Sequence, residues 1–392
     1  MAENGDTRTR LKDSSIVLFS KKWYSSVSIV EICKNAGLSN GVFYRYWKNK
    51  EELFLEILEN VISSIEEALD HIKVNGTKDK FADMTDIVFR FSWEHPDLIT
   101  IFREGQYRYI EYERRLSSMY RRILSKILGH EASIAEYLVA IGGMRYAAIR
   151  RALYGQDISL RPLLSLAAKG LFTELSMDKD KVFGITVSPP AIKLSASSRE
   201  RLLNIGKKLF AEKGYNEVNI HEITDAAKLS VGAFYTYFDS KESFFKEQVI
   251  TVGREIRHFI SSHLGKELNR LEREIQGLFL FSVYISLDNW CYDLVRECEF
   301  VAPETALAYY EAFKKGYLKM GKDGIRAELL EENPAALGSI AEYLMGISHY
   351  FGLEVAFRES PGNARAVAEE LAVLLSRGLF NSSQKEQLYE KN

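Results

Sequence analysis

Proline is scarce in this chain of 392 residues, which contains only 7 of them. Because proline breaks helix interiors, its scarcity favours an all-helical protein. Cysteine is rarer still, and Cys33, Cys291 and Cys298 form no C-x-x-C pair. The cysteines therefore predict neither a disulfide framework nor a zinc site, and they are typical of a reducing cytosol.

The sequence also lacks a strong net charge and a long apolar run. It has 52 Lys and Arg against 54 Asp and Glu, so any nucleic-acid binding must come from local contacts. The longest nearly unbroken apolar run, residues 277–287, is about half of what a bilayer span needs. Residues 1–10 lack the apolar core of a signal peptide. We therefore expect a cytoplasmic protein that does not bind membranes.

The motifs of common enzyme classes are missing as well. The chain has no phosphate-binding loop, no G-x-G-x-x-G, no G-x-S-x-G and no H-E-x-x-H motif. Its seven histidines are scattered. Even His258 and His263 are five residues apart, so they do not share one face of a helix. An enzyme would need a catalytic constellation that we do not find. We expect no catalytic residues, no cofactor and no metal.

What the chain does contain is a copy of itself. Residues 10–56 and 201–247 share 21 identities in 47 positions without a gap. Weaker matches continue to the end of each half, such as Ile134–Leu138 with Ile340–Leu344. Two repeats this long exceed a solenoid unit, so they indicate one whole protein present twice. Ser188-Pro-Pro190 lies between them and ends any helix.

Each copy begins with a pattern that predicts a helix-turn-helix. Ser28-Ile-Val-Glu31 predicts a capping box at the start of a short helix, and Asn219-Ile-His-Glu222 repeats it. Gly37-Leu38 predicts the turn, and Ser39 caps a second short helix. A long helix then begins near Lys50. In the second copy Lys228 replaces the turn glycine, where positive φ is often wanted, so that turn is expected to be strained.

The segments VSIVEICKNAGLSNGVFYRYWKNKEELF and VNIHEITDAAKLSVGAFYTYFDSKESFF resemble the DNA-binding signature of the tetracycline-repressor (TetR) family of bacterial transcription regulators. The resemblance implies an all-α fold with two tandem TetR-like repeats. Because members of the family pair as homodimers, it also implies an intramolecular pseudo-dimer. Tyr46 and Tyr237 stand where a histidine is common in the family.

The expected organisation has six segments. They are a helix-turn-helix DNA-binding domain (1–57), a helical ligand-binding and pairing domain (58–176), a linker (177–197), a second helix-turn-helix domain (198–250), a second helical domain (251–381) and a polar tail (382–392). We expect the helices around 134–154 and 340–357, together with 160–172 and 364–380, to pair the two copies. Gly142, Gly143 and Gly346 would permit their close approach.

The resemblance also assigns the DNA contacts. The base-facing positions are Asn40, Gly41, Val42 and Arg45 in the first copy and Val231, Gly232, Ala233 and Thr236 in the second. The phosphate-contacting positions are Tyr44, Tyr46, Lys50, Tyr235, Tyr237 and Lys241. Helix N-termini add Ser28, Ser39, Asn219 and Ser230. These types suit the task, since Asn pairs with adenine, Arg with guanine, and small apolar groups meet a thymine methyl.

A plainer interpretation makes the tyrosines partly core and the lysines solvated surface. For a lone residue we would prefer it, but the ungapped duplication of the whole pattern favours DNA contact. The two recognition helices differ at three of four base-facing positions, namely Asn40/Val231, Val42/Ala233 and Arg45/Thr236. We therefore expect two unlike half-sites, roughly 34–36 Å apart. Fusion also keeps the second domain at a high effective concentration.

The remainder of each copy is expected to bind an unidentified small-molecule effector. The candidate pocket residues, mostly aromatic, are Trp93, Phe102, Arg103, Tyr107, Tyr146, Trp290, Arg296 and Tyr350. The pairs Arg103-Glu104 and Arg296-Glu297 are more often surface or interhelical salt bridges than pocket groups. The expected function is a ligand-responsive repressor bound to double-stranded operator DNA. The alternative is a small-molecule-binding or protein-interaction module that has lost DNA binding in one or both domains, and further pairing of two chains stays open.

Overall fold

The computed structural model describes residues 2–70, 77–173, 175–187, 197–330, 335–356 and 364–380. Over these ranges the fold is all-α, as the sequence predicted. The one β-bridge within them is isolated and joins Phe172 to Ile325. We call residues 1–176 the first unit and residues 198–381 the second unit.

The first unit begins with a helix-turn-helix domain and continues as a helical bundle. Its N-terminal helices are α1 (Ala2–Phe19), the short 3-10 helix η1 (Tyr24–Ser26), α2 (Ile29–Asn35), α3 (Asn40–Phe43) and α4 (Lys50–Asp70). The bundle adds α5 (Thr77–Glu94), α6 (Pro96–Arg108), α7 (Ile110–Leu128), α8 (Ile134–Tyr137), the π-helical turn η2 (Leu138–Gly142), α9 (Gly143–Tyr154) and α10 (Leu160–Lys169).

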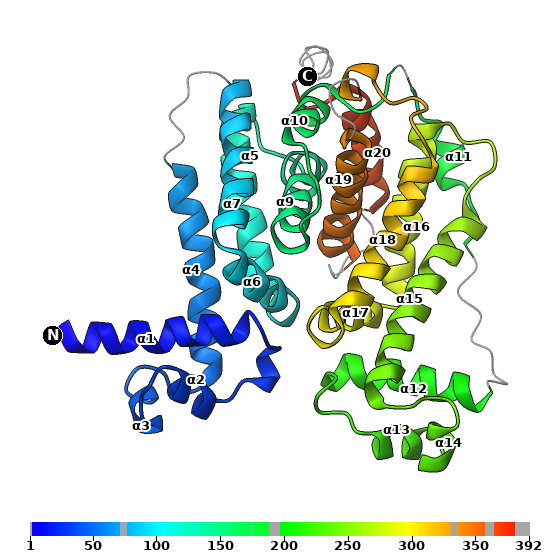
Figure 1. Cartoon of the computed structure of the whole chain (residues 1–392). Helices are drawn as coiled ribbons and strands as arrows, with labels where there is room; N and C mark the ends of the chain where they lie inside the picture. Colours follow the sequence, from blue (N-terminus) through cyan, green and yellow to red (C-terminus); the bar gives the residue numbers. More distant parts are fainter. Residues whose placement is uncertain are drawn as a thin grey trace.

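The second unit repeats this order. Its helix-turn-helix domain contains α12 (Ser198–Lys213), α13 (Ile220–Ala226), α14 (Val231–Tyr235) and the start of α15 (Lys241–His263). The bundle adds α16 (Arg270–Leu287), α17 (Trp290–Val301), α18 (Pro303–Lys319), the 3-10 helix η3 (Ala327–Leu329), α19 (Ala336–Phe351), the π-helical turn η4 (Gly352–Ala356) and α20 (Ala364–Arg377). Figure 1 shows both helix-turn-helix domains at the same end of the molecule.

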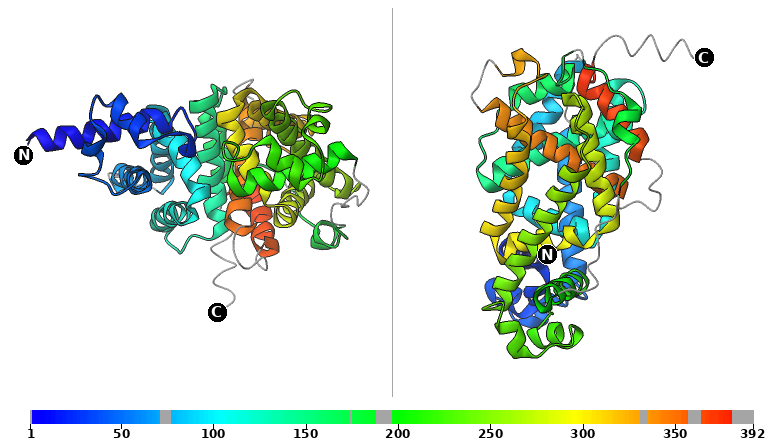
Figure 2. Two further views of the ribbon diagram at one scale, coloured as in Figure 1. Left: turned by 90° about the horizontal axis from the view of Figure 1, so that it is seen from below. Right: turned by 90° about the vertical axis from the view of Figure 1, so that its right-hand side faces the viewer.

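The two units pack along their central helices. α9 lies against α19, and α10 and α20 complete the contact. Seen from below, the blue and cyan helices of the first unit lie on one side and the green to orange helices of the second unit on the other (Figure 2). A Cβ on Gly346 would lie 2.5 Å from Cβ of Tyr146 and 3.0 Å from Cα of Gly143. The structure thus places the predicted glycines at the crossing, where no larger residue fits.

Part of the predicted linker is helical. α11 (Lys179–Phe183) lies on α16 of the second unit, and the Gln276 amide donates hydrogen bonds to the carbonyls of Lys181 (3.1 Å) and Val182 (2.9 Å). Val182 is buried in the core. Residues 188–196 of the linker and the predicted polar tail lie outside the described residues.

The turns of the two helix-turn-helix domains differ as the sequence predicted. Gly37 has φ of +67° and Lys228 has φ of +53°. Lys228 is the one non-glycine residue with positive φ among the described ranges. A side chain in this left-handed region costs about 1–2 kcal/mol. The second turn is therefore strained where the first is not.

We expect Lys228→Gly to raise the free energy of unfolding by about 0.5–1 kcal/mol, because relief of the left-handed strain outweighs the extra freedom of glycine in the unfolded chain. Urea denaturation of the full chain measures the change. Gly37→Lys in the first domain is the matched control, and it should destabilise. Equal stability of Lys228→Gly and the parent chain would contradict the strain.

Candidate nucleic-acid interface and cavity

The second helix of each helix-turn-helix domain leaves most of the predicted base-facing residues exposed. On α3, Asn40 and Gly41 are exposed and Val42 is half-buried, Arg45 is exposed in the turn that follows, and Phe43 is fully buried. A Cβ on Gly41 would meet nothing within 4 Å. Glycine is therefore not required there by the fold, which leaves close approach of a partner as its use.

α14 has the same arrangement with different residues. Gly232 and Thr236 are exposed, Val231 and Ala233 are half-buried, and Phe234 is buried. The hydroxyl of Thr236 donates to the carbonyl of Gly232 at 3.1 Å. Where the first domain offers an amide and a guanidinium, the second offers mainly apolar groups.

The predicted caps at Ser28 and Asn219 are present, whereas the predicted cap at Ser39 and the capping boxes at α2 and α13 are not. Ser28 Oγ accepts from the Glu31 amide at 3.1 Å, and Asn219 Oδ1 accepts from the Glu222 amide at 2.9 Å. The glutamates do not reach back as expected. Glu31 pairs instead with Lys22 at 2.5 Å. Glu222 pairs in the same way with Lys213 at the end of α12, since a cation at the end of the preceding helix outcompetes a backbone N–H for the carboxylate.

Ser39 and Ser230 precede the recognition helices and are both exposed. Ser230 Oγ accepts from the Ala233 amide at 3.2 Å, whereas the Ser39 side chain forms no cap hydrogen bond.

The predicted phosphate-contacting tyrosines are mostly exposed. Tyr44, Tyr235 and Tyr237 are 60%, 53% and 43% exposed, while Tyr46 is half-buried beside Trp47. The plainer interpretation, which makes the tyrosines partly core, therefore suits Tyr46 and not the other three. Exposed phenols next to a recognition helix are free to donate hydrogen bonds to phosphates.

Lys50 and Lys241, the predicted phosphate-contacting lysines, form hydrogen bonds within their own helix-turn-helix domains. The Lys50 ammonium donates to the carbonyls of Tyr24 (2.7 Å) and Val27 (2.6 Å). Lys241 donates to Tyr215 and Val218, both at 2.9 Å. Burial lowers the pKa of each lysine. Because an ammonium has three N–H bonds, one remains on each lysine for a phosphate.

A glutamate from each bundle holds the loop of its own helix-turn-helix domain. Both Glu104 carboxylate oxygens accept from the Tyr24 amide, at 2.9 and 3.1 Å. Glu297 accepts from the Tyr215 amide at 2.7 Å. Burial raises the pKa of Glu104 to about 8 and that of Glu297 to about 7. These bonds tie α6 and α17 directly to the two helix-turn-helix domains.

The neighbouring arginines meet across the two units. Arg103 of the first unit forms a two-pronged ion pair with Glu299 of the second, at 2.8 and 2.9 Å. Arg296 also donates to Glu299, at 2.5 Å. Burial alone would raise the pKa of Glu299, but the two arginines and the hydroxyls of Tyr310 and Tyr154 outweigh it and hold that pKa at about 2. Of the predicted interhelical ion pairs only that of Arg103 is found, with a partner that the sequence did not indicate. Arg296 pairs within α17, and Glu104 and Glu297 accept from backbone amides instead.

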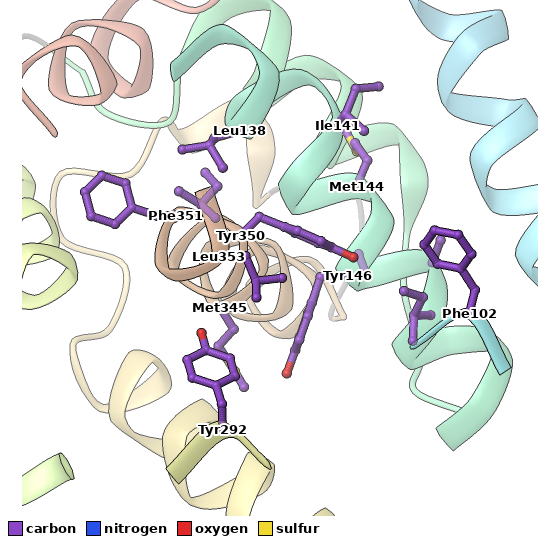
Figure 3. Packing of buried hydrophobic residues seen from close by; sticks show 14 of the residues in the cluster. Phe102, Leu138, Ile141, Met144, Tyr146, Tyr292, Met345, Tyr350, Phe351 and Leu353 are labelled. Atoms are coloured by element: carbon purple, nitrogen blue, oxygen red, sulfur yellow. The ribbon is translucent and has the colours of Figure 1, made fainter. Parts of the chain in front are cut away.

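A cavity of about 640 Å³ opens in the second unit, between α15, α16, α17, α18 and α19. Most of its lining is apolar and aromatic. Tyr146, from the first unit, contributes one wall, and Figure 3 shows its ring extending toward the region of Tyr292 and Met345. A volume of this size suits a drug-sized molecule. At the corresponding place in the first unit the space is only about 20 Å³.

The predicted pocket residues divide into several groups. Tyr146 and Arg296 line the large cavity. Phe102 and Arg103 border the small space of the first unit, and Tyr350 is buried at the interface. Trp93 is 64% exposed, and Trp290 is half-buried beneath Lys208. The side chain of Tyr107 lies outside the described residues.

The cavity is also lined by glycines and arginines that were not predicted, above all Gly277, Gly316 and Arg257. A position-by-position comparison of the two units gives the signal that could have found them. The first unit has Ile87, Ile123 and Glu66 at the equivalent places.

The family model for bacterial regulatory proteins of the tetR family matches the chain twice, at residues 13–57 and 202–247. The chain carries two tetR-family domains. Curated relatives include the transcriptional repressor KstR2 of Rhodococcus jostii, 44% identical over 20% of this chain and 36% of that protein. The regulator AcrR of Shigella flexneri is 42% identical over 17% of this chain and 30% of that protein. The matches thus span about a third of these relatives.

Solved structures of tetR-type regulators match one unit at a time. A transcriptional regulator from Aquifex aeolicus is 22% identical and covers 46% of this chain and 99% of its own length, with a TM-score of 0.37. PfmR from Thermus thermophilus is 21% identical and covers 47% and 97%, with a TM-score of 0.35.

Two further searches of the described part of the chain found nothing. No helix there is long and apolar enough to cross a membrane. No group of three or more His, Cys, Asp or Glu side chains there could hold a metal ion.

The glutamates that hold the tetR-family domains predict a pH dependence of stability. Burial raises the folded-state pKa values of both carboxyl groups above their ordinary value of about 4.5. The stability they contribute is therefore complete below about pH 4.5 and is lost as pH rises through about 7 to 8. We expect the unfolding free energy to fall from pH 5 to pH 8.5, relative to a Glu104→Gln/Glu297→Gln chain whose amides stay neutral. Parallel curves in urea denaturation would contradict this.

Proposed function

We propose that the protein is a DNA-binding transcription regulator, a ligand-responsive repressor that binds an asymmetric operator with two unlike helix-turn-helix domains. The observation that carries this proposal is the pair of exposed recognition surfaces, α3 and α14, at one end of a single chain (Figure 1). In a helix-turn-helix the second helix enters the major groove. Asn40 and Arg45 suit adenine and guanine, whereas Val231 and Ala233 suit thymine methyls.

The contacts between the units support a fixed spacing of the two domains. The Asn216 amide donates to Ser26 Oγ at 2.5 Å, so the loops of the two domains touch. Trp23 packs edge-on against Phe300 of α17, with ring centroids 5.1 Å apart. The buried pair between Arg150 and Glu342 adds a charged contact across the interface, at 3.0 Å. Preformed geometry of this kind lowers the entropic cost of binding two half-sites together.

The large cavity supports response to a small molecule. It lies in the bundle that holds the second tetR-family domain through Glu297, and a wall residue, Tyr146, comes from the other unit. A ligand that binds one arrangement of the units more tightly than another shifts the equilibrium toward it. In this proposal the unliganded arrangement binds the operator and represses, and the liganded arrangement binds DNA more weakly, so the ligand relieves repression.

The alternative is a chain whose second domain has lost DNA binding. The strained turn at Lys228 and the apolar residues of α14 favour it. Net charges of +2 for residues 1–57 and 0 for residues 195–247 favour it too, since basic surface supplies phosphate affinity. Salt dependence separates the two possibilities, because each phosphate contact adds to the slope of affinity against salt.

Selection of bound sites from a random duplex pool tests the proposed function. We expect the full chain to enrich two different half-sites about one helical turn apart. The sharper test is the triple substitution Val231→Asn, Ala233→Val and Thr236→Arg, which gives α14 the base-facing residues of α3. That chain should enrich a palindrome, because both domains then present the same groups.

The matched control leaves α14 unchanged and substitutes Arg45→Ala on α3. It should weaken binding about 10-fold or more and relax one half-site only, as loss of a bidentate contact to guanine predicts. If the parent chain enriches a single half-site and the triple substitution changes nothing, the second domain does not bind DNA. No enrichment at low salt would overturn the proposed function.

A further inference from the structure

The two units differ at the positions that decide whether a cavity exists. Gly277 on α16 and Gly316 on α18 line the cavity, and a Cβ on either would meet nothing within 4 Å. At the equivalent positions the first unit has Ile87 and Ile123, both buried. Isoleucine side chains fill in one unit the space that glycine leaves open in the other.

The seam above the cavity differs in charge as well. In the first unit Glu66 of α4 pairs with Arg122 of α7, which joins the two helices. The equivalent positions in the second unit are Arg257 of α15 and Lys315 of α18. Two cations cannot form this ion pair and repel each other instead. The seam is therefore joined by an ion pair in the first unit, whereas in the second it is positively charged and Arg257 lies over the Phe313 ring of α18, 5.4 Å from its centroid.

The cavity itself has cations without carboxylate partners. Arg254, Arg257 and Arg273 line it, and none of them forms an ion pair with a described residue. Arg273 Nε is buried without a hydrogen-bond partner among those residues. The one acidic lining residue, Glu274, is already paired with Arg270 at 2.8 Å. The cavity thus combines apolar walls with guanidinium groups that an anion would satisfy.

One carboxylate connects this cavity to both units. Arg296 lines the cavity and donates to Glu299, which also binds Arg103 of the first unit. The first unit has Gln106 in place of Glu299, and Gln106 Oε1 is buried with no hydrogen-bond partner in the described chain. Two buried arginines therefore depend on a single carboxylate, supplied by the second unit.

Each arginine precedes a glutamate that holds a tetR-family domain. Glu104 follows Arg103 and accepts from the Tyr24 amide, and Glu297 follows Arg296 and accepts from the Tyr215 amide. A shift of either arginine therefore moves the backbone that positions one loop. The route from the cavity to the second domain stays within α17, whereas the route to the first domain crosses the interface at Glu299.

We infer that one anionic, largely apolar molecule binds in the second unit alone and acts on both tetR-family domains through Glu299. The anion competes with Glu299 for Arg296, which changes how Glu299 holds Arg103. The inference rests on the proposed function only for its consequence on DNA, since the site and its connections exist without DNA. It departs from the symmetry of a homodimer, in which both subunits have the same site.

Dodecanoate is a suitable probe, with dodecyltrimethylammonium as the cation of matched chain length. Isothermal titration of the full chain should give one dodecanoate per chain and at least about tenfold weaker binding of the cation. The Gly277→Ile/Gly316→Ile chain copies the first unit and should fold but lose dodecanoate binding. Two sites per chain, no binding of dodecanoate, equal affinity for the cation, or binding kept by the filled variant would each overturn the inference.

Arg257→Glu gives the second unit the residue of the first and should weaken dodecanoate about tenfold or more, since it replaces an attractive charge by a repulsive one. Glu66→Arg makes the reverse exchange in the first unit and is the matched control. It should leave dodecanoate affinity unchanged. An equal loss in both variants would place the binding site elsewhere.

Hydrogen exchange of residues 20–28 and 214–219 tests the connection without DNA. Dodecanoate should change exchange in both loops of the parent chain. In Arg103→Gln, Glu299 keeps Arg296 as its partner, so the chain should fold and only the second loop should respond. If the Glu299→Gln chain folds, dodecanoate should likewise change hydrogen exchange in the second loop only. An unchanged response of the first loop in Arg103→Gln would overturn the role of Glu299.

These outcomes are independent of the selection experiment. Suppose that the chain enriches no DNA but binds one dodecanoate, and that binding changes hydrogen exchange in both loops. This result would contradict the proposed function alone. A chain that enriches an asymmetric site but binds two dodecanoates would contradict the inference alone.

Discussion

The crossing of α9 and α19 is the contact on which the rest of the molecule depends. At this crossing Gly143 and Gly346 bring two backbones together, because a Cβ on Gly346 would lie 3.0 Å from Cα of Gly143. The Tyr343 hydroxyl donates to the Val139 carbonyl at 2.5 Å and fixes the register of the two helices. Small residues at a helix crossing allow close packing, and close packing admits little sliding. The spacing of the two helix-turn-helix domains is therefore set by a contact far from them.

Once the two units were joined, their equivalent positions no longer had to serve the same purpose. The first unit has ion pairs between α4 and α7 and isoleucines within its bundle. The second unit has glycines there instead, and its cavity arginines Arg254, Arg257 and Arg273 form no ion pair with a described residue. A homodimer cannot differ in this way, because one substitution changes both subunits. Glu299 shows the same division in the buried cluster, since the unit that holds the cavity also supplies the carboxylate that both arginines need.

Much of the fold could be predicted from the sequence. Helix signals depend on residues close together in the chain, and the duplication shows in the sum of many matched positions. The turn at Lys228 and the glycines of the crossing followed from single residues whose backbone needs are known. The capping-box glutamates were predicted wrongly, because Lys22 competes for Glu31 in three dimensions. Aromatic content also misdirected the pocket prediction, placing Trp93 in a pocket although it is largely exposed. A cavity forms where side chains from several helices leave a space unfilled. The sequence of any one helix therefore does not predict it.

The unlike surfaces of α3 and α14 give the molecule a direction. A symmetric dimer on a palindrome is unchanged when it is turned end for end, so its two faces along the DNA are interchangeable. A chain with two different recognition helices in a fixed order binds its site in one orientation only. In the proposed function, the unit that holds the cavity would then always lie on the same side of the operator, upstream or downstream. Any protein that approaches along the DNA from one side would therefore always meet the same unit. The operator would then specify an orientation as well as a position.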